Sequence, residues 1–386
     1  MKKTYWHAHN LPRIFILTLC MFSLIGMYLV ERFKTFVPQD YYIEKIAASQ
    51  LAKQAFSVVK SRRHWLGISI NKHDDPQQSG LIGYRLTNMT TDEGELSAKQ
   101  TSINPNIAAL FVDWLKRLNL KQGDVIALSA TGSFPAFNIS MLAAIKTLGL
   151  KPLIIYSMGA SQYGANVLGF TWLDMNHELK VKHVFDYSPL GVTLGGVHDI
   201  ALGMTEPVRT ALKNTIHRYN FNYVDPEDTV DSIDKRMSLF QQGAGNKPIK
   251  AYINIGGGVA SIGLKHLSVQ NKIIKIHKRV HYRSLPTGVI TSLPIDLANT
   301  DSVAVRFLKE GVPIINIRNV SQGIRVQYDL PRSPKFTPVI GWGPIFFHEE
   351  YNVTLTVLVL LMILSFLAIL AVLSRRYLIR YIPTRR

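Results

Sequence analysis

The hydrophobic pattern divides the chain into two apolar ends and a long middle in which apolar and polar stretches alternate. Residues 14–30 are an uncharged run of 17 residues, and residues 353–373 are a second uncharged run of 21 residues. A helix needs about 20 apolar residues to cross the hydrocarbon core of a bilayer. The pattern therefore predicts two transmembrane helices that enclose a domain at residues 31–352.

The sequence after the first apolar run indicates that this run is not a cleaved signal peptide. The residues "MYLVERFK" contain no small-x-small cleavage site. The apolar stretch is also longer than the apolar region of an ordinary signal peptide. We therefore expect an uncleaved membrane anchor.

Basic residues flank the outer ends of both apolar runs. They are Lys2, Lys3 and Arg13 before the first run and Arg375, Arg376, Arg380, Arg385 and Arg386 after the second. Since Lys and Arg gather on the cytoplasmic side of membranes, the tails at residues 1–13 and 374–386 are expected in the cytoplasm and the main domain outside. The single cysteine, Cys20, lies in the first run, so the outer domain needs no disulfide. A bacterial inner membrane with a periplasmic or extracellular domain is the simplest assignment.

The outer domain keeps a basic balance when the tails are set aside. The chain has a net charge of +18, and outside the tails 36 basic residues remain against 26 acidic ones. A basic outer domain can attract anionic lipid or an anionic polymer, although an ordinary basic soluble domain fits the same balance. The basic residues are dispersed and no nucleic-acid motif is present, so no nucleic-acid partner is expected.

The middle of the chain has the pattern of an α/β domain. An apolar strand at residues 125–128 is followed by a helix at 135–148 and a second apolar strand at 152–156. A strand, a helix and a strand within about 30 residues form a βαβ unit with parallel strands. Both strands are apolar throughout, which is typical of a sheet covered on both faces.

Further elements continue this pattern. Helices are predicted at residues 41–59, 205–219, 228–242 with Gly243 as its stop, and 301–310, and strands at 251–255 and 313–317. A further helix is predicted to begin at Pro105, with Asn104 as its cap, and to stop before Gly123. The fold class is therefore α/β, with a mainly parallel open sheet and flanking helices, held between an N-terminal and a C-terminal transmembrane helix. Open parallel sheets bind ligands beyond the carboxyl ends of their strands. Loops at 129–134, 157–166, 256–263 and 318–322 follow predicted strands, so we expect them to open on one edge and to form the site.

The glycine loop "NIGGGVASIG" permits close approach of the backbone to a ligand. Ser261 stands where the dinucleotide-binding pattern needs its third glycine, and Leu264 stands where a P-loop needs its lysine. No nucleotide cofactor is therefore expected. Gly256, Gly257, Gly258 and Ser261 remain candidates for holding a carboxylate or phosphate through backbone N–H groups, or for a plain tight turn.

The loop "SMGASQYGAN" alternates small residues with uncharged polar ones. Ser157, Ser161, Gln162 and Asn166 can hydrogen-bond a polar ligand without adding charge. A surface loop without a ligand fits the same composition.

The turn "ATGSFP" places Thr131, Gly132 and Ser133 between the first strand and its helix, as candidate ligand contacts. Ser133 is also the candidate nucleophile, with His198 as base and Asp199, or alternatively Asp174 or Asp186, as orienting acid. Neighbouring residues rarely form such a pair, and the glycine of a nucleophile elbow is missing. Ser133 therefore fits a helix cap better, and N–H groups beside such a cap can hold an anion.

Metal-binding patterns are weak in this chain. The acidic run "DPEDTVDSID" has Val230 where an EF-hand needs glycine and Arg236 at the twelfth place. Acidic residues at the start of a helix also suit the helix dipole. No metal and no other cofactor is expected.

Three segments carry a resemblance to a known family. The sequences "LSATGSFPAFNISMLAAI", "GASQYGANVLGFTWLDM" and "INIGGGVASIG" resemble poly-γ-glutamate system proteins, over roughly residues 41–328. That family accompanies the synthase and membrane subunits of bacterial poly-γ-glutamate capsule production. The resemblance implies an accessory role in synthesis or export, with the polymer and membrane subunits of the synthase as partners. The second apolar run is a departure from the family.

Three functions stay open on this basis. The leading one is a membrane-anchored accessory protein whose outer domain binds the anionic polymer or a synthase subunit. The second is a hydrolase or transferase that trims or attaches the polymer through Ser133. The third is an envelope-anchored sensor or assembly factor for another polymer. A basic domain suits the capture of a chain with one carboxylate per residue, because opposite charges attract over about a Debye length.

Overall fold

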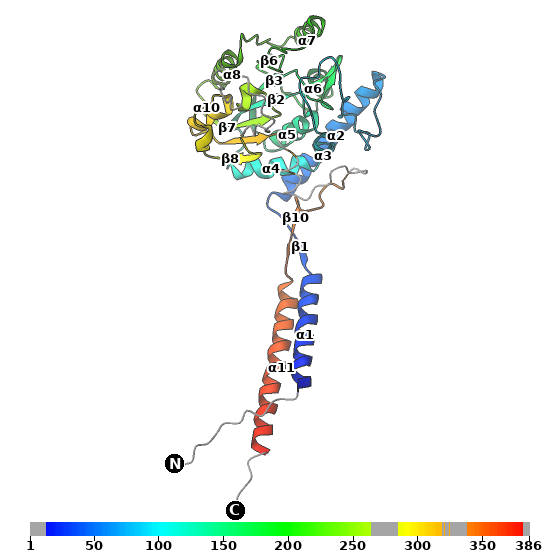
Figure 1. The fold of residues 1–386 in the computed structure, drawn as a ribbon, viewed down its shortest axis with the longest axis vertical. Helices are drawn as coiled ribbons and strands as arrows, with labels where there is room; N and C mark the ends of the chain where they lie inside the picture. Colours follow the sequence, from blue (N-terminus) through cyan, green and yellow to red (C-terminus); the bar gives the residue numbers. More distant parts are fainter. Residues whose placement is uncertain (1–12, 264–284, 319, 321–323, 325–337, 381–386) are drawn as a thin grey trace, which may run out of the picture. The chain divides into compact units, whose positions relative to one another are not determined.

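The computed structural model describes residues 13–263, 285–318, 320, 324 and 338–380 (Figure 1). The chain divides into two compact units, which are described separately. The first comprises residues 1–39 and 347–386, and the second comprises residues 40–346.

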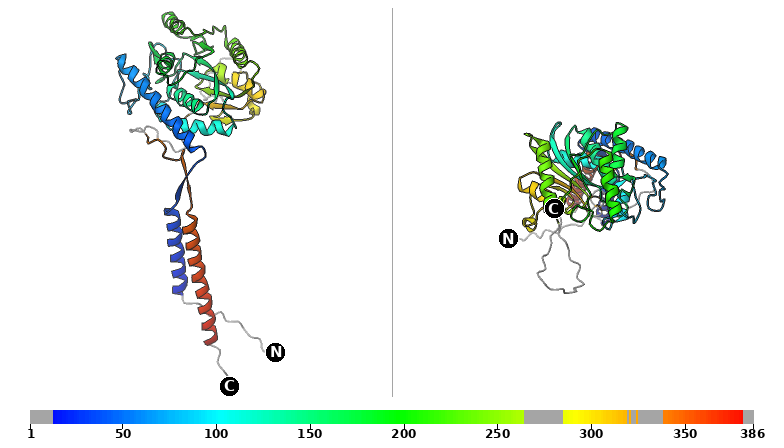
Figure 2. Two further views of the ribbon diagram at one scale, coloured as in Figure 1. Left: turned by 180° about the vertical axis from the view of Figure 1, so that it is seen from behind. Right: turned by 90° about the horizontal axis from the view of Figure 1, so that it is seen from above.

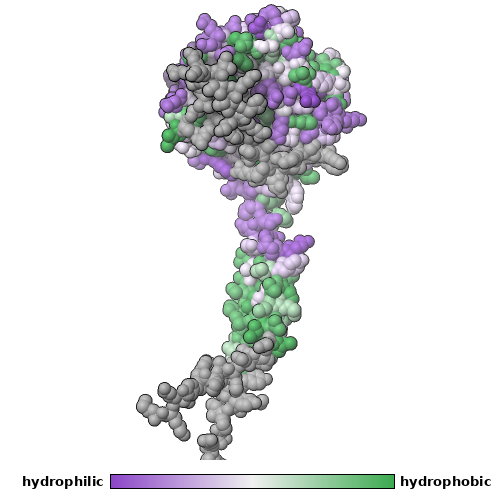
Figure 3. Space-filling view, in the orientation of Figure 1, coloured by the Kyte–Doolittle hydropathy of each residue, from purple (hydrophilic) through white to green (hydrophobic). Residues whose placement is uncertain are grey.

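The first unit contains two long apolar helices, α1 (Arg13–Arg32) and α11 (Val353–Arg380). Both are long and apolar enough to cross a membrane, over residues 14–32 and 353–373, and apolar side chains cover them (Figure 3). The helices pack closely, since a Cβ added at Gly26 would lie 2.5 Å from Val359 Cγ1. Strand β1 (Thr35–Pro38) follows α1, strand β10 (Phe347–Glu350) precedes α11, and the two strands pair antiparallel.

The second unit is built on a six-stranded sheet with the order β6-β3-β2-β7-β9-β8. Its strands are β2 (Val125–Thr131), β3 (Lys151–Ser157), β6 (Gly191–Thr193), β7 (Ile249–Ile255), β8 (Gly288–Ile290) and β9 (Ile314–Ile317). The strands from β6 to β9 pair in parallel, and β8 runs antiparallel to β9. A short hairpin forms from β4 (Asn166–Val167) and β5 (Phe170–Thr171). The predicted α/β fold with a mainly parallel sheet is confirmed.

Helices cover both faces of this sheet (Figure 2). One layer contains α2 (Tyr42–Trp65), α4 (Ile107–Arg117), α5 (Pro135–Thr147) and α6 (Trp172–Val181), and the other contains α8 (Thr229–Ala244), α9 (Val259–Ile262) and α10 (Val303–Lys309). The remaining helices are α3 (Leu96–Ser102), α7 (Glu206–Arg218) and the 3₁₀ turn η1 (Ile295–Leu297). Because successive side chains of a strand point to opposite faces, buried strands between two helical layers need apolar residues at every position.

The core between the sheet and the α8–α10 layer contains aromatic and aliphatic side chains. Tyr252 of β7 stacks on Phe307 of α10, with ring centroids 5.0 Å apart, and Phe240 of α8 packs edge-on against Tyr252 at 6.1 Å. These rings are buried, as are Ala127 and Ile314 on the neighbouring strands. Removal of this apolar surface from water is the main favourable contribution to folding.

Element boundaries differ from the sequence predictions at several places, and two of them are instructive. The predicted stop at Gly243 is wrong, because α8 continues to Ala244 and the chain leaves the helix at Gly245, whose φ is 55°. The predicted cap at Asn104 is also displaced, since α4 begins at Ile107 with Asn106 as its N-cap. Asn104 Oδ1 instead accepts the Asn106 N–H at 3.0 Å in a turn before the helix.

Candidate functional site

The loops that follow β2, β3 and β7 meet at the carboxyl edge of the sheet. Gly132 N–H donates to the Ser157 carbonyl at 3.1 Å, and Ala165 N–H donates to the Gly132 carbonyl at 2.7 Å. A Cβ added at Gly256 would lie 2.2 Å from Thr131 Oγ1, and φ at Gly256 is 101°. The structure therefore brings together three of the four predicted loops. In the fourth, residues 319, 321 and 322 lie outside the described residues.

Polar side chains form two rows across the carboxyl ends of the parallel strands. One row is Ser129, Asn254 and Asn316, and the other is Thr131, Ser157 and Thr193. All six are buried. Because the members of each row are in register, their side chains share the face covered by α8 and α10. Both rows face the same space between the sheet edge and that helical layer.

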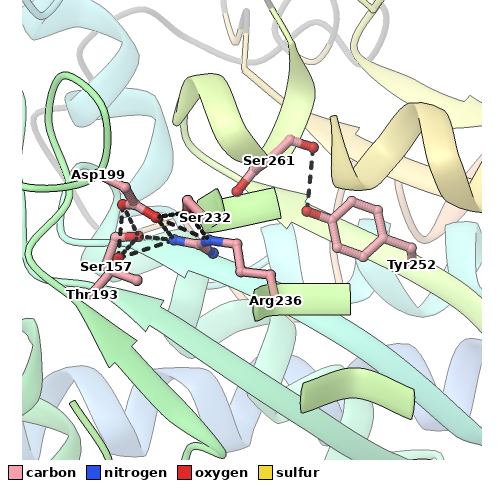
Figure 4. Close-up of polar contacts among 7 residues, drawn as sticks. All are labelled: Ser157, Thr193, Asp199, Ser232, Arg236, Tyr252 and Ser261. Atoms are coloured by element: carbon pink, nitrogen blue, oxygen red, sulfur yellow. Dashed lines mark hydrogen bonds and ion pairs between the residues drawn. The ribbon is translucent and has the colours of Figure 1, made fainter. Parts of the chain in front are cut away.

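Arg236 of α8 donates hydrogen bonds to two members of the second row, Ser157 and Thr193 (Figure 4). Its Nη2 donates to Ser157 Oγ at 2.8 Å, to Thr193 Oγ1 at 3.0 Å and to Asp199 Oδ2 at 2.5 Å. Ser232 Oγ also donates to Asp199 Oδ2, at 2.6 Å. Burial alone raises the pKa of Asp199, but the Arg236 guanidinium and the surrounding hydroxyls hold that pKa below its usual range. The pair is therefore a buried ion pair with a full set of donors on its carboxylate.

The loop that carries Asp199 has a strained backbone. His198, Asp199 and Ala201 have φ values of 54°, 67° and 56°, in the left-handed region that side chains with a Cβ rarely adopt. Each such residue costs of order 1 kcal/mol or more and persists where surrounding contacts hold it. The bonds from Arg236 and Ser232 to Asp199 supply those contacts.

Lys99 of α3 lies at the same corner as Ser133. Its Nζ donates to Ser161 Oγ at 2.9 Å and to the Ser133 carbonyl, and it lies 3.7 Å from the centroid of the Phe134 ring. The side chain is 2% exposed and forms no ion pair with any described carboxylate. Burial lowers the pKa of Lys99 to about 7. Near neutral pH this lysine therefore exchanges between its charged and its neutral form.

The predicted helix-cap role of Ser133 is wrong. The N-cap of α5 is Phe134, and no side chain caps this helix. Ser133 Oγ instead accepts the Ser161 N–H at 3.1 Å, while Ser133 N–H donates to Thr131 Oγ1 at 3.2 Å. The Ser133 hydroxyl therefore bonds to the loop at residues 157–166 that follows β3 (the β3 loop), and it does not cap α5.

The structure does not bring together Ser133, His198 and Asp199. His198 is exposed, and its Nδ1 lies 3.0 Å from Thr229 Oγ1. Asp199 is held by Arg236 and the hydroxyls around it. Neither residue contacts Ser133, so the geometry of a Ser–His–Asp triad is not formed by these three side chains.

Two other predicted ligand contacts hold neighbouring segments of the chain. Asn166 is buried; its Nδ2 donates to the Tyr84 carbonyl at 2.7 Å, and its Oδ1 accepts the Tyr84 N–H at 3.0 Å. Gln162 N–H donates to the Asp92 carbonyl at 3.0 Å, and its Oε1 accepts the Gly94 N–H at 3.2 Å. Both side chains fix the segment before α3 onto the β3 loop, which positions Lys99.

The glycine loop combines open backbone with a buried serine. Ser261 is buried in α9, and its carbonyl accepts the Tyr252 hydroxyl at 3.5 Å (Figure 4). A Cβ added at Gly257 would lie 3.6 Å from Arg318 Nε, and one at Gly258 would meet only its own neighbour Ser261 within 4 Å. In the part of the chain that the structure describes, the N–H groups of Gly257 and Gly258 form no hydrogen bond.

Arg318 follows β9 and lies beside Gly257. Burial lowers its pKa from the ordinary value and the carboxylate of Asp92 opposes this shift, while the side chain stays half-buried. Within the described ranges its guanidinium forms no hydrogen bond and no ion pair. A guanidinium has five N–H donors in a planar fork that suits carboxylates. Arg318 is thus a half-buried positive group after β9 that pairs with no carboxylate in the part of the chain that the structure describes.

Lys99 and Arg236 were not predicted as site residues from the sequence. Arg236 was read as a basic residue suited to a helix dipole, and Lys99 lies in a segment without a predicted element. Arg236 could have been found from the sequence, because the helical spacing places this basic residue on the inward face of its helix. No feature of the sequence around Lys99 indicates a role for that residue. No family model, no curated protein and no solved structure matches this chain.

Proposed function

We propose that this protein is a membrane-anchored accessory factor whose α/β unit binds an anionic, carboxylate-bearing polymer at the carboxyl edge of its sheet. Poly-γ-glutamate is the polymer favoured by the resemblance of the three sequence motifs. Its synthesis or export is the process in which the protein takes part. Supporting features are the basic balance of the outer domain and the two apolar helices at the ends of the chain.

The observation that carries the proposal is Arg318 beside the glycine loop, which pairs with none of the described carboxylates. Its half-buried guanidinium has no partner among the described carboxylates, and the N–H groups of Gly257 and Gly258 are open next to it. A carboxylate that enters here receives charge-assisted hydrogen bonds from the guanidinium and backbone bonds from the loop. Such a site recognises one carboxylate of a repeating chain.

Replacing Arg318 with glutamine is expected to weaken binding of poly-γ-glutamate roughly ten- to a hundredfold, because hydrogen bonds to charged groups contribute about 1.5–3 kcal/mol. Binding of the full chain in detergent micelles to a fluorescent polymer is the measurement. Titration at several salt concentrations is expected to show weaker binding as salt rises, since screening reduces attraction between charges.

Arg306→Gln is the matched control. Arg306 carries the same charge, but its guanidinium donates to Asp301 at 2.7 Å and to Asp234 at 2.5 Å. Its loss is expected to change polymer binding little. Equal weakening by both substitutions, or no binding by the unaltered protein at low salt, contradicts the proposed site.

The proposed topology places both termini in the cytoplasm and the α/β unit outside. Protease added to spheroplasts is expected to digest the unit at residues 40–346 while a tag placed after Arg386 stays intact. The basic residues that follow the second apolar run are the reason, because they resist transfer across the membrane. Digestion of the tag with survival of the α/β unit reverses the assignment.

A further inference from the structure

Ser161 and Lys99 form a hydroxyl–amine pair at the sheet edge. Lys99 Nζ lies 2.9 Å from Ser161 Oγ. Ser161 is half-buried, whereas Lys99 is 2% exposed. A partly open hydroxyl backed by a buried amine is the arrangement that a serine nucleophile and its general base require.

We propose that Ser161 is a nucleophile activated by Lys99, and that the sheet edge cleaves or transfers amide bonds of a carboxylate-bearing chain. The choice of substrate class rests on the proposed function. The pair of residues rests on its own geometry. Serine–lysine pairs are one of the known variants of the serine–histidine–acid arrangement.

The surroundings of Lys99 suit its neutral form. A neutral amine has two N–H donors and one lone pair. In the neutral form the Ser133 carbonyl still accepts one N–H, and the Phe134 ring centroid lies 3.7 Å from Nζ. The bond that the charged lysine donates to Ser161 Oγ then reverses, and the Nζ lone pair accepts the Ser161 hydroxyl proton. Within the described ranges no carboxylate pairs with the Lys99 ammonium, so desolvation favours the uncharged base.

The ionisable groups around Lys99 do not oppose this state. Asp92, Glu93 and Glu95 precede α3 in the chain, and Arg318 follows β9 on the other side of the glycine loop. None of these forms an ion pair with Lys99. The helix α5 and the β3 loop contribute Phe134, a carbonyl and a hydroxyl to its surroundings, which are uncharged groups.

The proposed reaction balances with water as the second reactant. Ser161 Oγ attacks the amide carbonyl carbon while its proton moves to Lys99 Nζ. The carbon–nitrogen bond then breaks, and the ammonium of Lys99 gives its proton to the departing amine. Water attacks the resulting ester, Lys99 takes a proton from that water, and the proton returns to Ser161 Oγ as the acyl group leaves. An amine in place of water gives transfer.

Arg318 follows β9 and lies beside Gly257 of the glycine loop. The carboxylate of Asp92 acts on Arg318, and the Asp92 carbonyl accepts the N–H of Gln162, the residue after Ser161.

The test is labelling of the full chain in detergent micelles with a fluorophosphonate, which reacts with activated serines. Intact mass and peptide mapping are expected to show one adduct on Ser161. The labelling rate is expected to rise with pH through a midpoint near 7, the pKa to which burial lowers Lys99. Ser161→Ala is expected to reduce labelling at least a hundredfold.

Ser188→Ala is the matched control, because Ser188 forms the same pair in an exposed setting, with Lys180 Nζ at 2.7 Å from its Oγ. It is expected to leave labelling unchanged. Lys99→Met is expected to abolish labelling at pH 8. If Lys99→Met fails to fold, as judged by its melting curve, Ser161→Ala and the pH profile still decide.

The outcomes separate this inference from the proposed function. Polymer binding without labelling overturns the Ser161–Lys99 pair and leaves the binding function standing. Labelling at Ser161 without binding of poly-γ-glutamate supports the pair and overturns the proposed polymer. A labelling rate that is flat between pH 6 and pH 9 overturns the role of Lys99. Cleavage of poly-γ-glutamate by the unaltered protein and not by Ser161→Ala supports both.

Discussion

Replacing Asp199 with alanine is expected to lower the free energy of unfolding by about 3–5 kcal/mol, because the guanidinium of Arg236 is then buried without its counter-charge. Asp199 also accepts hydrogen bonds from Ser232 and Thr193, at 2.6 Å and 2.8 Å, which are lost together. The left-handed backbone of the loop at residues 195–203 loses its anchor at the same time. Thermal denaturation of the full chain in detergent measures the change, with an expected fall in melting temperature of roughly 10 °C.

Lys235, the residue before Arg236 in α8, provides the control. Lys235 pairs with Asp231 at 2.7 Å, but this pair lies near the surface and is only half-buried. Since surface ion pairs contribute little, Lys235→Ala is expected to leave the melting temperature close to that of the unaltered protein. If Asp199→Ala and Lys235→Ala lower the melting temperature by similar amounts, burial is not what makes the Arg236–Asp199 pair important for stability.

The Asp199 pair also predicts how stability changes with acid. The pKa of Asp199 is lower in the folded chain than its ordinary value of 3.8. Its contribution to stability is therefore complete above that value and is lost as the pH falls through the folded-state pKa. The difference in melting temperature between the unaltered protein and Asp199→Ala is expected to shrink below that pH.

Replacing Gly83 with alanine is expected to destabilise the α/β unit by roughly 3 kcal/mol or more, because overpacking and lost hydrogen bonds add together. A Cβ at Gly83 would lie 1.9 Å from the Gly164 carbonyl oxygen and 2.3 Å from Asn166 Oδ1. Relief requires the β3 loop to move away, which breaks the bond from Gly83 N–H to the Tyr163 carbonyl at 3.0 Å. Thermal denaturation measures the loss, and polymer binding is expected to fall with it.

Gly243→Ala is the matched change in a helix. There the added Cβ would meet Leu190 Cδ1 at 2.7 Å, the flexible end of a side chain that can turn aside. Alanine also favours a helix by roughly 1 kcal/mol over glycine. Gly243→Ala is therefore expected to be neutral or mildly stabilising. A Gly83→Ala protein with the melting temperature of the unaltered chain shows that the β3 loop adapts without cost.

The sheet was predictable from the sequence because its strands are buried on both faces. A strand between two helical layers needs apolar residues at nearly every position, and the runs around Ile126 and Ile154 show this pattern directly. The helix between them follows from its Pro135 start. Since parallel strands end at one edge, the sequence also indicated where the loops meet.

The contacts within the edge were not predictable, because they join residues far apart in the chain. Ser133 is a plausible cap by its neighbours, yet Ser161 N–H, 28 residues later, takes its hydroxyl. Arg236 meets Ser157 across 79 residues. Local rules describe what a side chain can do, whereas the register of the sheet and the packing of α8 decide which partner it finds.

The β1–β10 ribbon has a consequence for the order of events during synthesis. Thr35 pairs with Glu350, 315 residues later, so β1 emerges long before its partner exists. Folding of the α/β unit brings its own ends together, as Tyr42 and Phe346 lie with ring centroids 6.2 Å apart. Closing a long flexible loop is opposed by chain entropy, and a folded insert removes most of that entropy beforehand. The ribbon and the helix pair are therefore expected to assemble last, on a chain whose α/β unit has already folded.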